Sequence, residues 1–407
     1  MTQQAHEAPE ARHQERGATR RTAVSGGRDV FIVSNSVDET GGVTTWTHQM
    51  ARQFAGRGHR VHVVGITPAP AGRRHHFPGP LPYATTTLYD EHPPQVRPLR
   101  GVRGRLNAVE RRRHAVRAAG MRERADRMTA LFAAARPGAV VIVTQVWAME
   151  WVTLADTGRL IVIGMGHESY AASAATSRLS RMKRHYRDVD RLLLLTPGDA
   201  DRWIRAGMDN VGHMPNALPF VPPAPVPRTG KVVVSVGRLS HEKGMDMLLD
   251  SWAEVAPRRP DWKLRIYGTG DEELRLLRRT ADLGLDGSVE WRGRTDDVLG
   301  ALSEASVFAQ ASRAEGFPIT LLEAMAAGVP CAAFDCAPGV REIIRDGEDG
   351  LLARLGNTVE LGGHIDALIA DEELRNRMGD AAFANVRRYA PDRITDRWEE
   401  LFAFLER

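Results

Sequence analysis

Apolar and polar positions along the first part of the chain predict a strand, a helix and a second strand. Residues 30–33 and residues 61–64 are short apolar runs with the period of buried strands. Between them an apolar stripe recurs at helical spacing, formed by Val43, Trp46, Met50 and Phe54. This order is a βαβ unit, so we expect a parallel α/β sheet.

Three further apolar runs predict more strands of the same sheet, at residues 139–143, 160–164 and 192–195. Residues 67–98 break the pattern because they are rich in proline and histidine. We interpret that segment as an irregular insertion.

The segment at residues 221–230 holds four prolines and can be neither a helix nor a central strand. It is typical of an extended linker, and a second strand–helix series follows it directly. The predicted strands are 231–236, 264–267, 288–291, 307–310 and 331–334, and the predicted helices are 244–255, 271–283, 296–304 and 318–327.

The chain therefore divides into five predicted parts. They are a disordered tail (1–28), a Rossmann-like domain (29–220), a linker (221–230), a second Rossmann-like domain (231–390) and a final helix (391–407). The fold class is α/β, with two doubly wound domains facing a cleft, and ligands of such sheets bind outside the carboxyl ends of the strands.

Composition agrees with this organisation. A chain of 407 residues fits two domains, and 43% hydrophobic with 26% charged residues is typical of a globular enzyme. No apolar run approaches the length of a membrane span, and the first 28 residues lack the apolar core of a signal peptide. Two cysteines, Cys331 and Cys336, exclude a disulfide framework and a four-cysteine zinc site. We expect a cytoplasmic protein.

The net charge of +4 says little about partners, because only four of the 55 basic residues are lysines and the arginine excess is typical of a GC-rich genome. Lysine is a rare choice in this chain. Lys243, which follows the first strand of the second domain together with Arg238, therefore attracts attention. Two cations at a strand end suit a diphosphate and a leaving group's negative charge, although two solvated surface cations would look the same.

Two acids, Glu315 and Glu323, flank the start of the helix predicted at 318–327. Eight helical residues correspond to about 12 Å, so these carboxylates are too far apart to act on one glycosidic bond. They suit different contacts on one elongated ligand, and the helix N-terminus between them offers free backbone N–H groups to an anion. The alternative is a surface acid and simple compensation of the helix dipole.

Three motifs occur in order along the chain: Gly41-Gly42, Gly237-Arg238 with Lys243-Gly244, and Glu315 with Glu323. Together they resemble the retaining glycosyltransferases of family 4, which have the GT-B fold. The resemblance covers the chain from Asp29 onward and is strongest across residues 232–352. It implies that the first domain binds an acceptor, that the second binds a nucleotide sugar, and that the last helix packs back on the first domain.

The resemblance also implies roles for single side chains. Arg238 and Lys243 would clamp the donor diphosphate, and Glu323 would hydrogen-bond the ribose hydroxyls. Glu315 would contact the donor sugar on the face of its anomeric carbon, with His167 beside that sugar. His167 is equally typical of a packed structural histidine at a strand end.

Backbone groups would complete the implied site. The Gly41-Gly42 loop would approach the phosphates and the acceptor, unless it is a mere turn, and the backbone of Gly316, Phe317 and Ile319 would meet donor oxygens. Such enzymes need no metal, and no Asp-x-Asp follows a predicted strand here. We therefore expect neither a metal nor a cofactor.

The run Asp335-Cys336-Ala337-Pro338-Gly339-Val340-Arg341-Glu342-Ile343-Ile344 resembles a segment of family members that use UDP-hexoses or UDP-N-acetylhexosamines. The expected function is transfer of such a sugar, with retention, to an acceptor that is a glycolipid, a cell-surface polymer, an inositol phosphate or a metabolite. The alternatives are a GT-B sugar-nucleotide epimerase and a non-catalytic sugar-nucleotide-binding protein.

A basic stretch lies in the first domain, where eleven arginines from Arg97 to Arg127 face three acidic residues. A basic amphipathic helix can rest on an anionic membrane, which would place the protein at the inner face of the cell membrane. The alternative is an arginine-rich solvated helix. The stretch has no interleaved aromatic residues, so we expect no nucleic-acid partner.

Overall fold

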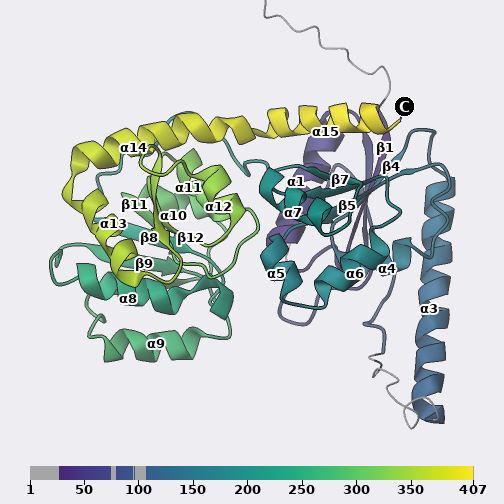
Figure 1. Cartoon of the computed structure of the whole chain (residues 1–407), viewed down its shortest axis with the longest axis horizontal. Coiled ribbons are helices and arrows are strands. Elements are labelled where there is room, and N and C mark those ends of the chain that lie inside the picture. Colours follow the sequence, from purple (N-terminus) through teal and green to yellow (C-terminus); the bar gives the residue numbers. More distant parts are fainter. Residues whose placement is uncertain (1–26, 75–78, 95, 97–106, 407) are drawn as a thin grey trace, which may run out of the picture.

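A computed structural model describes residues 27–74, 79–94, 96 and 107–406, and these residues form two parallel sheets with helices on both faces of each (Figure 1). The first sheet has the strand order β3-β2-β1-β4-β5-β6-β7, and the second has the order β10-β9-β8-β11-β12-β13. Every pair of neighbouring strands is parallel. The predicted fold class, two doubly wound α/β units, is confirmed.

The strands of the first sheet are β1 (Asp29–Ser34), β2 (Arg60–Gly65), β3 (Ala84–Thr87), β4 (Val140–Val143), β5 (Ile161–Gly166), β6 (Arg191–Leu194) and β7 (Val211–His213). The strands of the second sheet are β8 (Val232–Val236), β9 (Lys263–Tyr267), β10 (Val289–Gly293), β11 (Val307–Gln310), β12 (Cys331–Asp335) and β13 (Gly350–Arg354).

Helices accompany the strands in both halves of the chain. Those of the first half are α1 (Gly42–Gly56), α3 (Ala108–Ala133), α4 (Val146–Val152), α5 (Tyr170–Ala174), α6 (Arg178–His185) and α7 (Pro197–Arg205). Those of the second half are the 3-10 turn η1 (His241–Lys243), α8 (Met245–Val255), α9 (Glu273–Asp282), α10 (Val298–Ser303), α11 (Ile319–Ala326), α12 (Pro338–Ile343), α13 (Thr358–Ala370), α14 (Glu372–Asn385), the 3-10 turn η2 (Val386–Tyr389) and α15 (Pro391–Leu405).

Alternating residues of the central strands enter different cores, as expected for strands buried on both faces. In β1, Val30 and Ile32 join one hydrophobic cluster, whereas Phe31 and Val33 join another. The first of these clusters also contains Val234 of β8 and continues into the second sheet's helices. One continuous core therefore joins the two halves of the molecule.

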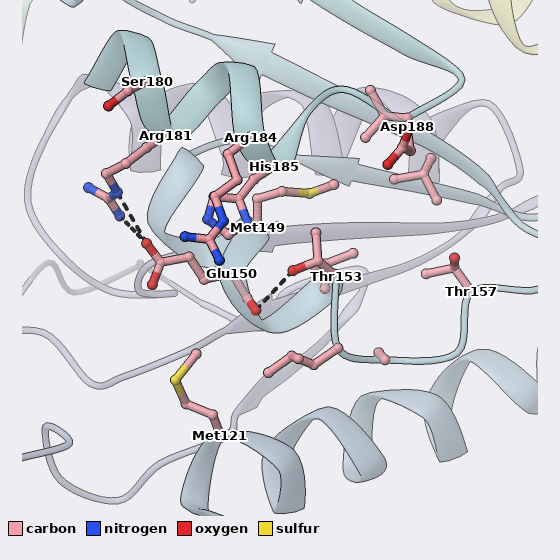
Figure 2. A pocket seen from close by; sticks show the side chains of 15 residues that line it. Met121, Met149, Glu150, Thr153, Thr157, Ser180, Arg181, Arg184, His185 and Asp188 are labelled. Atoms are coloured by element: carbon pink, nitrogen blue, oxygen red, sulfur yellow. Dashed lines mark hydrogen bonds and ion pairs between the residues drawn. The ribbon is translucent and has the colours of Figure 1, made fainter. Parts of the chain in front are cut away.

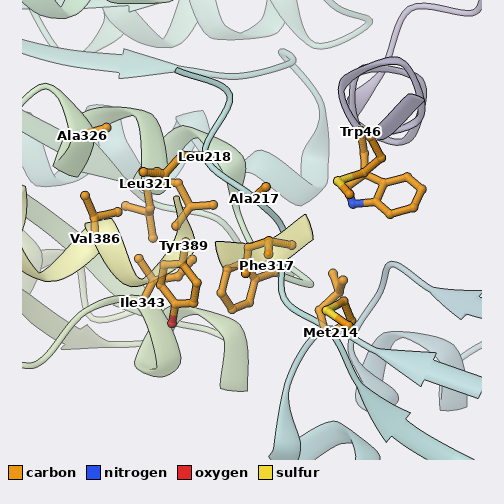
Figure 3. Packing of buried hydrophobic residues seen from close by; sticks show 14 of the residues in the cluster. Trp46, Met214, Ala217, Leu218, Phe317, Leu321, Ala326, Ile343, Val386 and Tyr389 are labelled. Atoms are coloured by element: carbon orange, nitrogen blue, oxygen red, sulfur yellow. The ribbon is translucent and has the colours of Figure 1, made fainter. Parts of the chain in front are cut away.

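Figure 3 shows the junction of this shared core, where Phe317 lies between Tyr389 and Met214, with Ala217 and Leu218 to one side of it. The rings of Phe317 and Tyr389 meet edge to face at 5.2 Å. Nδ2 of Asn216 donates to the carbonyl of Phe317 at 3.0 Å. The two halves are in direct contact just beside the predicted site.

The last helix, α15, crosses from the second half onto α1 (Figure 1). Its Trp398 is fully buried, with its ring 6.1 Å from that of Trp46 and 6.0 Å from that of Phe54. At the edge of this contact, Arg57 forms an ion pair with Asp396 at 2.8 Å. The apolar stripe of the final helix thus covers the first domain.

Two segments differ from the expectations drawn from sequence. The insertion at residues 67–98 contains a short edge strand, β3, whose Ala-Thr-Thr-Thr sequence has no apolar face. The predicted tail lies outside the described residues except for Gly27 and Arg28. Arg28 is not part of a free tail, because its guanidinium donates to the carbonyl of Gly138 at 2.9 Å and forms an ion pair with Glu406.

Candidate functional site

The predicted site residues lie at the carboxyl ends of neighbouring central strands. Gly41 follows β1, Arg238 follows β8, and Glu315 follows β11. In each sheet the strand order reverses here, between β1 and β4 and between β8 and β11. Such switch points are where doubly wound sheets bind their ligands.

The centre of the site is an ion pair between Lys243 and Glu315. Nζ of Lys243 lies 2.6 Å from Oε1 of Glu315, with the two side chains 31% and 9% exposed. The same Oε1 accepts from the hydroxyl of Ser312 at 2.7 Å and from Nε2 of Gln310 at 3.3 Å. All three contacts converge on one oxygen, so among the described residues nothing donates to Oε2, which can accept from a ligand.

The turn that carries Lys243 is pressed against the end of β11. Gly244, which follows Lys243, has a φ of 61°, and a Cβ added there would lie 2.0 Å from the carbonyl oxygen of Ala311. Glycine is required because it tolerates positive φ and leaves room for that carbonyl. The Lys243-Gly244 motif therefore has a structural reason that sequence alone did not supply.

Arg238 is exposed and reaches toward the glycine loop of the first domain. A Cβ added to Gly41 would lie 3.9 Å from Nη2 of Arg238. A Cβ added to Gly42 would meet nothing within 4 Å, so no neighbour among the described residues requires glycine at that position. Open space at Gly42 is compatible with a ligand that approaches the backbone.

Glu323 lies within helix α11, eight residues after Glu315, and is 9% exposed. Burial raises the pKa of its carboxyl from 4.5 to about 8. At neutral pH the group is therefore mainly protonated in this structure and can donate as well as accept a hydrogen bond.

His167 lies where the first and second halves of the molecule meet. Its ring packs edge-on against Trp46 at 5.1 Å, and its Nε2 is buried without a hydrogen-bond partner among the described residues. Burial lowers the pKa of His167 from 6.5 to about 4, so the ring is neutral at neutral pH. A Cβ added to Gly316 would lie 2.0 Å from the carbonyl oxygen of His167, which explains glycine there.

The backbone of the loop before α11 is free to bind a ligand. Among the described residues, no acceptor takes a hydrogen bond from the backbone amides of Gly316, Phe317 or Ile319. The Phe317 side chain is buried in the shared core, so only its backbone can serve the site. Helix α11 begins at Ile319, one residue later than predicted, because Pro318 is its N-cap.

Sequence reasoning missed the side chains that support this centre. Ser312 and Gln310 fix Glu315, and Thr320 donates to Oε1 of Gln310 at 3.3 Å. Ser312 could have been found from its position three residues before Glu315, on the same loop. Arg313 and Asp246 also form a close pair behind the centre, at 2.7 Å.

A separate hollow of about 910 Å³ lies between α3, α4 and α6, and none of the predicted site residues lines it (Figure 2). In one wall Glu150 binds Arg181 at 2.6 Å, so these two charges neutralise each other. Arg184 and His185 enter from the same helix, and Met121 of α3 lies opposite.

The basic stretch forms most of helix α3, and residues 97–106 of it lie outside the described residues. Three of its arginines contact other segments of the first half, and a fourth, Arg113, pairs with Glu110 of the same helix at 2.9 Å. The Arg117 guanidinium lies over the ring of Trp151, that of Arg124 lies over the ring of Tyr89, and Arg127 donates to a carbonyl at 2.9 Å. Near its start α3 exposes Val109 and Val116, at 62% and 55%.

Neither a metal cluster nor a membrane-spanning helix is found within the described part of the chain. No group of three or more His, Cys, Asp or Glu side chains there could hold a metal ion. No helix among those residues is both long and apolar enough to cross a bilayer.

Two parallel doubly wound sheets with their switch points facing one site, and a last helix returning to the first domain, define the GT-B fold. The staphylococcal TarM structure, described as a complex with fondaparinux, α-GlcNAc-glycerol and UDP, is similar with a TM-score of 0.74. It is 13% identical and covers 92% of this chain and 99% of TarM.

Sequence comparison gives the family. The model of the family described as glycosyl transferases group 1 matches residues 221–384. An uncharacterized glycosyltransferase of Haemophilus influenzae is 32% identical over 237 residues, which are 57% of this chain and 67% of that protein. The chain belongs to the glycosyl transferases group 1 family.

A further relative is longer than this chain. An exopolysaccharide phosphotransferase of Streptomyces coelicolor is 34% identical over 274 residues, which are 61% of this chain. The chain spans 29% of the length of that relative.

Proposed function

We propose that the protein is a retaining glycosyltransferase that transfers a hexose or an N-acetylhexosamine from a UDP-sugar to an acceptor. The observation that carries the proposal is the convergence of Lys243 and Glu315 at the end of β11, with Arg238 facing Gly41 nearby. Family membership and the UDP named in the TarM complex support this assignment.

In the proposed reaction the protein supplies charge and position. Lys243 and Arg238 neutralise the diphosphate, and that charge favours departure of the nucleotide from the anomeric carbon. The free Oε2 of Glu315 accepts from sugar hydroxyls, while its Oε1 stays fixed by the three donors described above. A carboxylate that is already held in place needs no reorganisation when charge develops on the sugar.

The nucleoside part of the donor would extend along α11. Glu323, mainly protonated at neutral pH, can both donate to and accept from ribose hydroxyls. The amides of Gly316, Phe317 and Ile319 would bind oxygens of the sugar or the phosphates, since amides at a helix start attract anions. The acceptor would enter from the side of Gly41 and Gly42.

The test is a panel of UDP-, GDP- and ADP-sugars, with release of the nucleotide followed by chromatography. Release of UDP from a UDP-hexose or UDP-N-acetylhexosamine, with an α-anomeric product by NMR, would support the proposal. Interconversion of the sugar without release of UDP would instead favour an epimerase. Tight binding of UDP without any turnover would favour a binding protein.

The proposed membrane contact has its own support in α3. The exposed Val109 and Val116 lie seven residues apart, on one face of the helix, and the exposed Arg112 and Arg113 lie on either side of that face. Apolar side chains flanked by arginines suit the boundary between headgroups and acyl chains of an anionic bilayer. The contact would bring the protein to acceptors carried by a membrane.

A further inference from the structure

A second ion pair lies directly behind the pair of Lys243 and Glu315. The guanidinium of Arg313 binds both carboxylate oxygens of Asp246, with Nη1–Oδ1 at 2.7 Å and Nη2–Oδ2 at 2.8 Å. Arg313 precedes Glu315 by two residues, and Asp246 follows Lys243 by three. The two ion pairs therefore link the same two segments of the chain.

Arg313 also binds the backbone of the turn that carries Lys243. Its backbone N–H donates to the carbonyl of Glu242 at 2.7 Å, and its Nη1 donates to the carbonyl of His241 at 2.9 Å. These carbonyls belong to η1, a single turn of three residues. One side chain and its own amide thus hold most of the turn.

The charge on Asp246 strengthens this arrangement. Burial alone would raise the pKa of Asp246, but the hydrogen bonds and the charge of Arg313 outweigh burial and lower this pKa to about 2. The carboxylate stays ionised throughout the physiological range. Bidentate pairing of arginine with a carboxylate also fixes the plane of the guanidinium, which a lysine could not do.

We propose that Arg313, held by Asp246, is a positioning residue that fixes the Lys243 turn against the loop of Glu315. The inference rests on the proposed function, in which Lys243 acts on the donor diphosphate. Lysine has a long, flexible side chain, and a catalytic group must stay within about 0.5 Å of its working position. Because the backbone of Lys243 is fixed, its ammonium can occupy fewer positions.

The small number of lysines makes this proposal directly measurable. The chain has four, Lys183, Lys231, Lys243 and Lys263. Amine acylation followed by mass spectrometry would give the rate of labelling at each. Lys231 and Lys263 lie in the same domain as Lys243, at the starts of β8 and β9, and report whether that domain stays folded.

We expect Arg313→Ala to raise the labelling rate of Lys243 about fivefold or more, the effect of losing one ordinary hydrogen bond, with Lys231 and Lys263 unchanged. Arg313→Lys should give an intermediate rate, because it keeps the charge but not the bidentate contact. Arg275→Ala is the matched control, since Arg275 also faces Asp246, at 3.6 Å, and forms no bond to the turn. Its Lys243 rate should match that of the wild type.

Equal labelling of Lys243 in the wild type and Arg313→Ala, or an equal rise in Arg275→Ala, would overturn the proposal. If Lys231 and Lys263 also react faster in Arg313→Ala, that variant has loosened the whole domain and Arg313→Lys decides instead. An unchanged Lys243 rate in Arg313→Lys would then count against the proposal.

The labelling involves no donor, so it separates this inference from the proposed function. Added UDP should protect Lys243 of the wild type. A positioning effect of Arg313 without protection by UDP would contradict the donor site and leave the positioning role intact. Protection by UDP with no effect of Arg313→Ala would support the donor site and contradict the positioning role of Arg313.

Discussion

Lys243 and Glu315, 72 residues apart in sequence, form an ion pair at 2.6 Å between the end of β11 and the turn after β8. Glu315 is 9% exposed, so its carboxylate depends on this partner and on Ser312 and Gln310. A donor diphosphate would share the ammonium of Lys243 with Glu315. The pair therefore links stability of the site to its proposed chemistry.

This link predicts different behaviour for the two cations of the site. Lys243→Ala and Arg238→Ala should each lower donor turnover about a hundredfold or more, as loss of one charge-stabilising group does. Only Lys243→Ala should also lower the melting temperature, because it leaves the largely buried side chain of Glu315 without its cationic partner. Arg238 is exposed, so its replacement should not change the melting temperature.

Turnover with a UDP-sugar and differential scanning calorimetry would check both parts. Lys231→Ala is a suitable control, because Lys231 lies on the surface of the same domain and pairs with Asp261. Near-normal turnover in either site variant would contradict the assignment of the diphosphate clamp.

Glu323 predicts a pH dependence of stability. Its pKa is raised from 4.5 to about 8 in the folded protein, so the folded state holds a proton that the unfolded chain has lost. The contribution of this group is fully present below the unfolded pKa and is lost as pH rises through about 8. As the pH rises from 4.5 to about 8, the melting temperature of the wild type should therefore fall relative to that of Glu323→Gln. Parallel pH profiles would show that Glu323 is not buried as an acid.

Much of the fold could be predicted from sequence because hydrophobic periodicity carries it. The strand at Val307–Gln310 was predicted with its observed bounds, since its four residues are all buried. The strand β3 was missed because Ala-Thr-Thr-Thr lies at a sheet edge, where no core imposes an apolar face.

Motif spacing located the site residues but not the contacts between them. Arg313 meets Asp246 across 67 residues, and no local pattern predicts which arginine of an arginine-rich chain will find that carboxylate. For the same reason, the sequence did not show that the arginines of α3 have different environments. Arg117 and Arg124 pack on aromatic rings, whereas Arg111 and Arg112 remain exposed, a difference that only tertiary structure makes.

The absence of a metal requirement stays a prediction. Donor turnover should survive EDTA, because Lys243 and Arg238 supply the positive charge that Mg²⁺ provides elsewhere. Assays with EDTA, and with added Mg²⁺ or Mn²⁺, would check it. A strict and saturable requirement for either ion would contradict the proposed role of the two cations.

The membrane proposal predicts binding that depends on salt and on lipid charge. Vesicles with anionic lipid should sediment the protein at low salt and release it at high salt, because screening acts within about 8 Å at physiological ionic strength. Replacing Arg111, Arg112 and Arg113 by Ser should weaken this binding and leave donor turnover unchanged.

A matched variant carries three serine replacements elsewhere, at the exposed Arg278, Arg377 and Arg393. It loses the same net charge, so any difference between the two variants reports on position. Equal sedimentation of both variants would contradict the membrane contact and favour the alternative, an arginine-rich solvated helix.

The most direct test of the account is calorimetric titration of UDP into the wild type, Lys243→Ala and Arg184→Ala. Lys243 marks the proposed donor site, and Arg184 marks the separate hollow between α3, α4 and α6. We expect Lys243→Ala to weaken UDP binding about tenfold or more, the loss of a charge-assisted hydrogen bond, and Arg184→Ala to bind as the wild type does. Wild-type affinity in Lys243→Ala, or weaker binding in Arg184→Ala alone, would contradict the donor site proposed here.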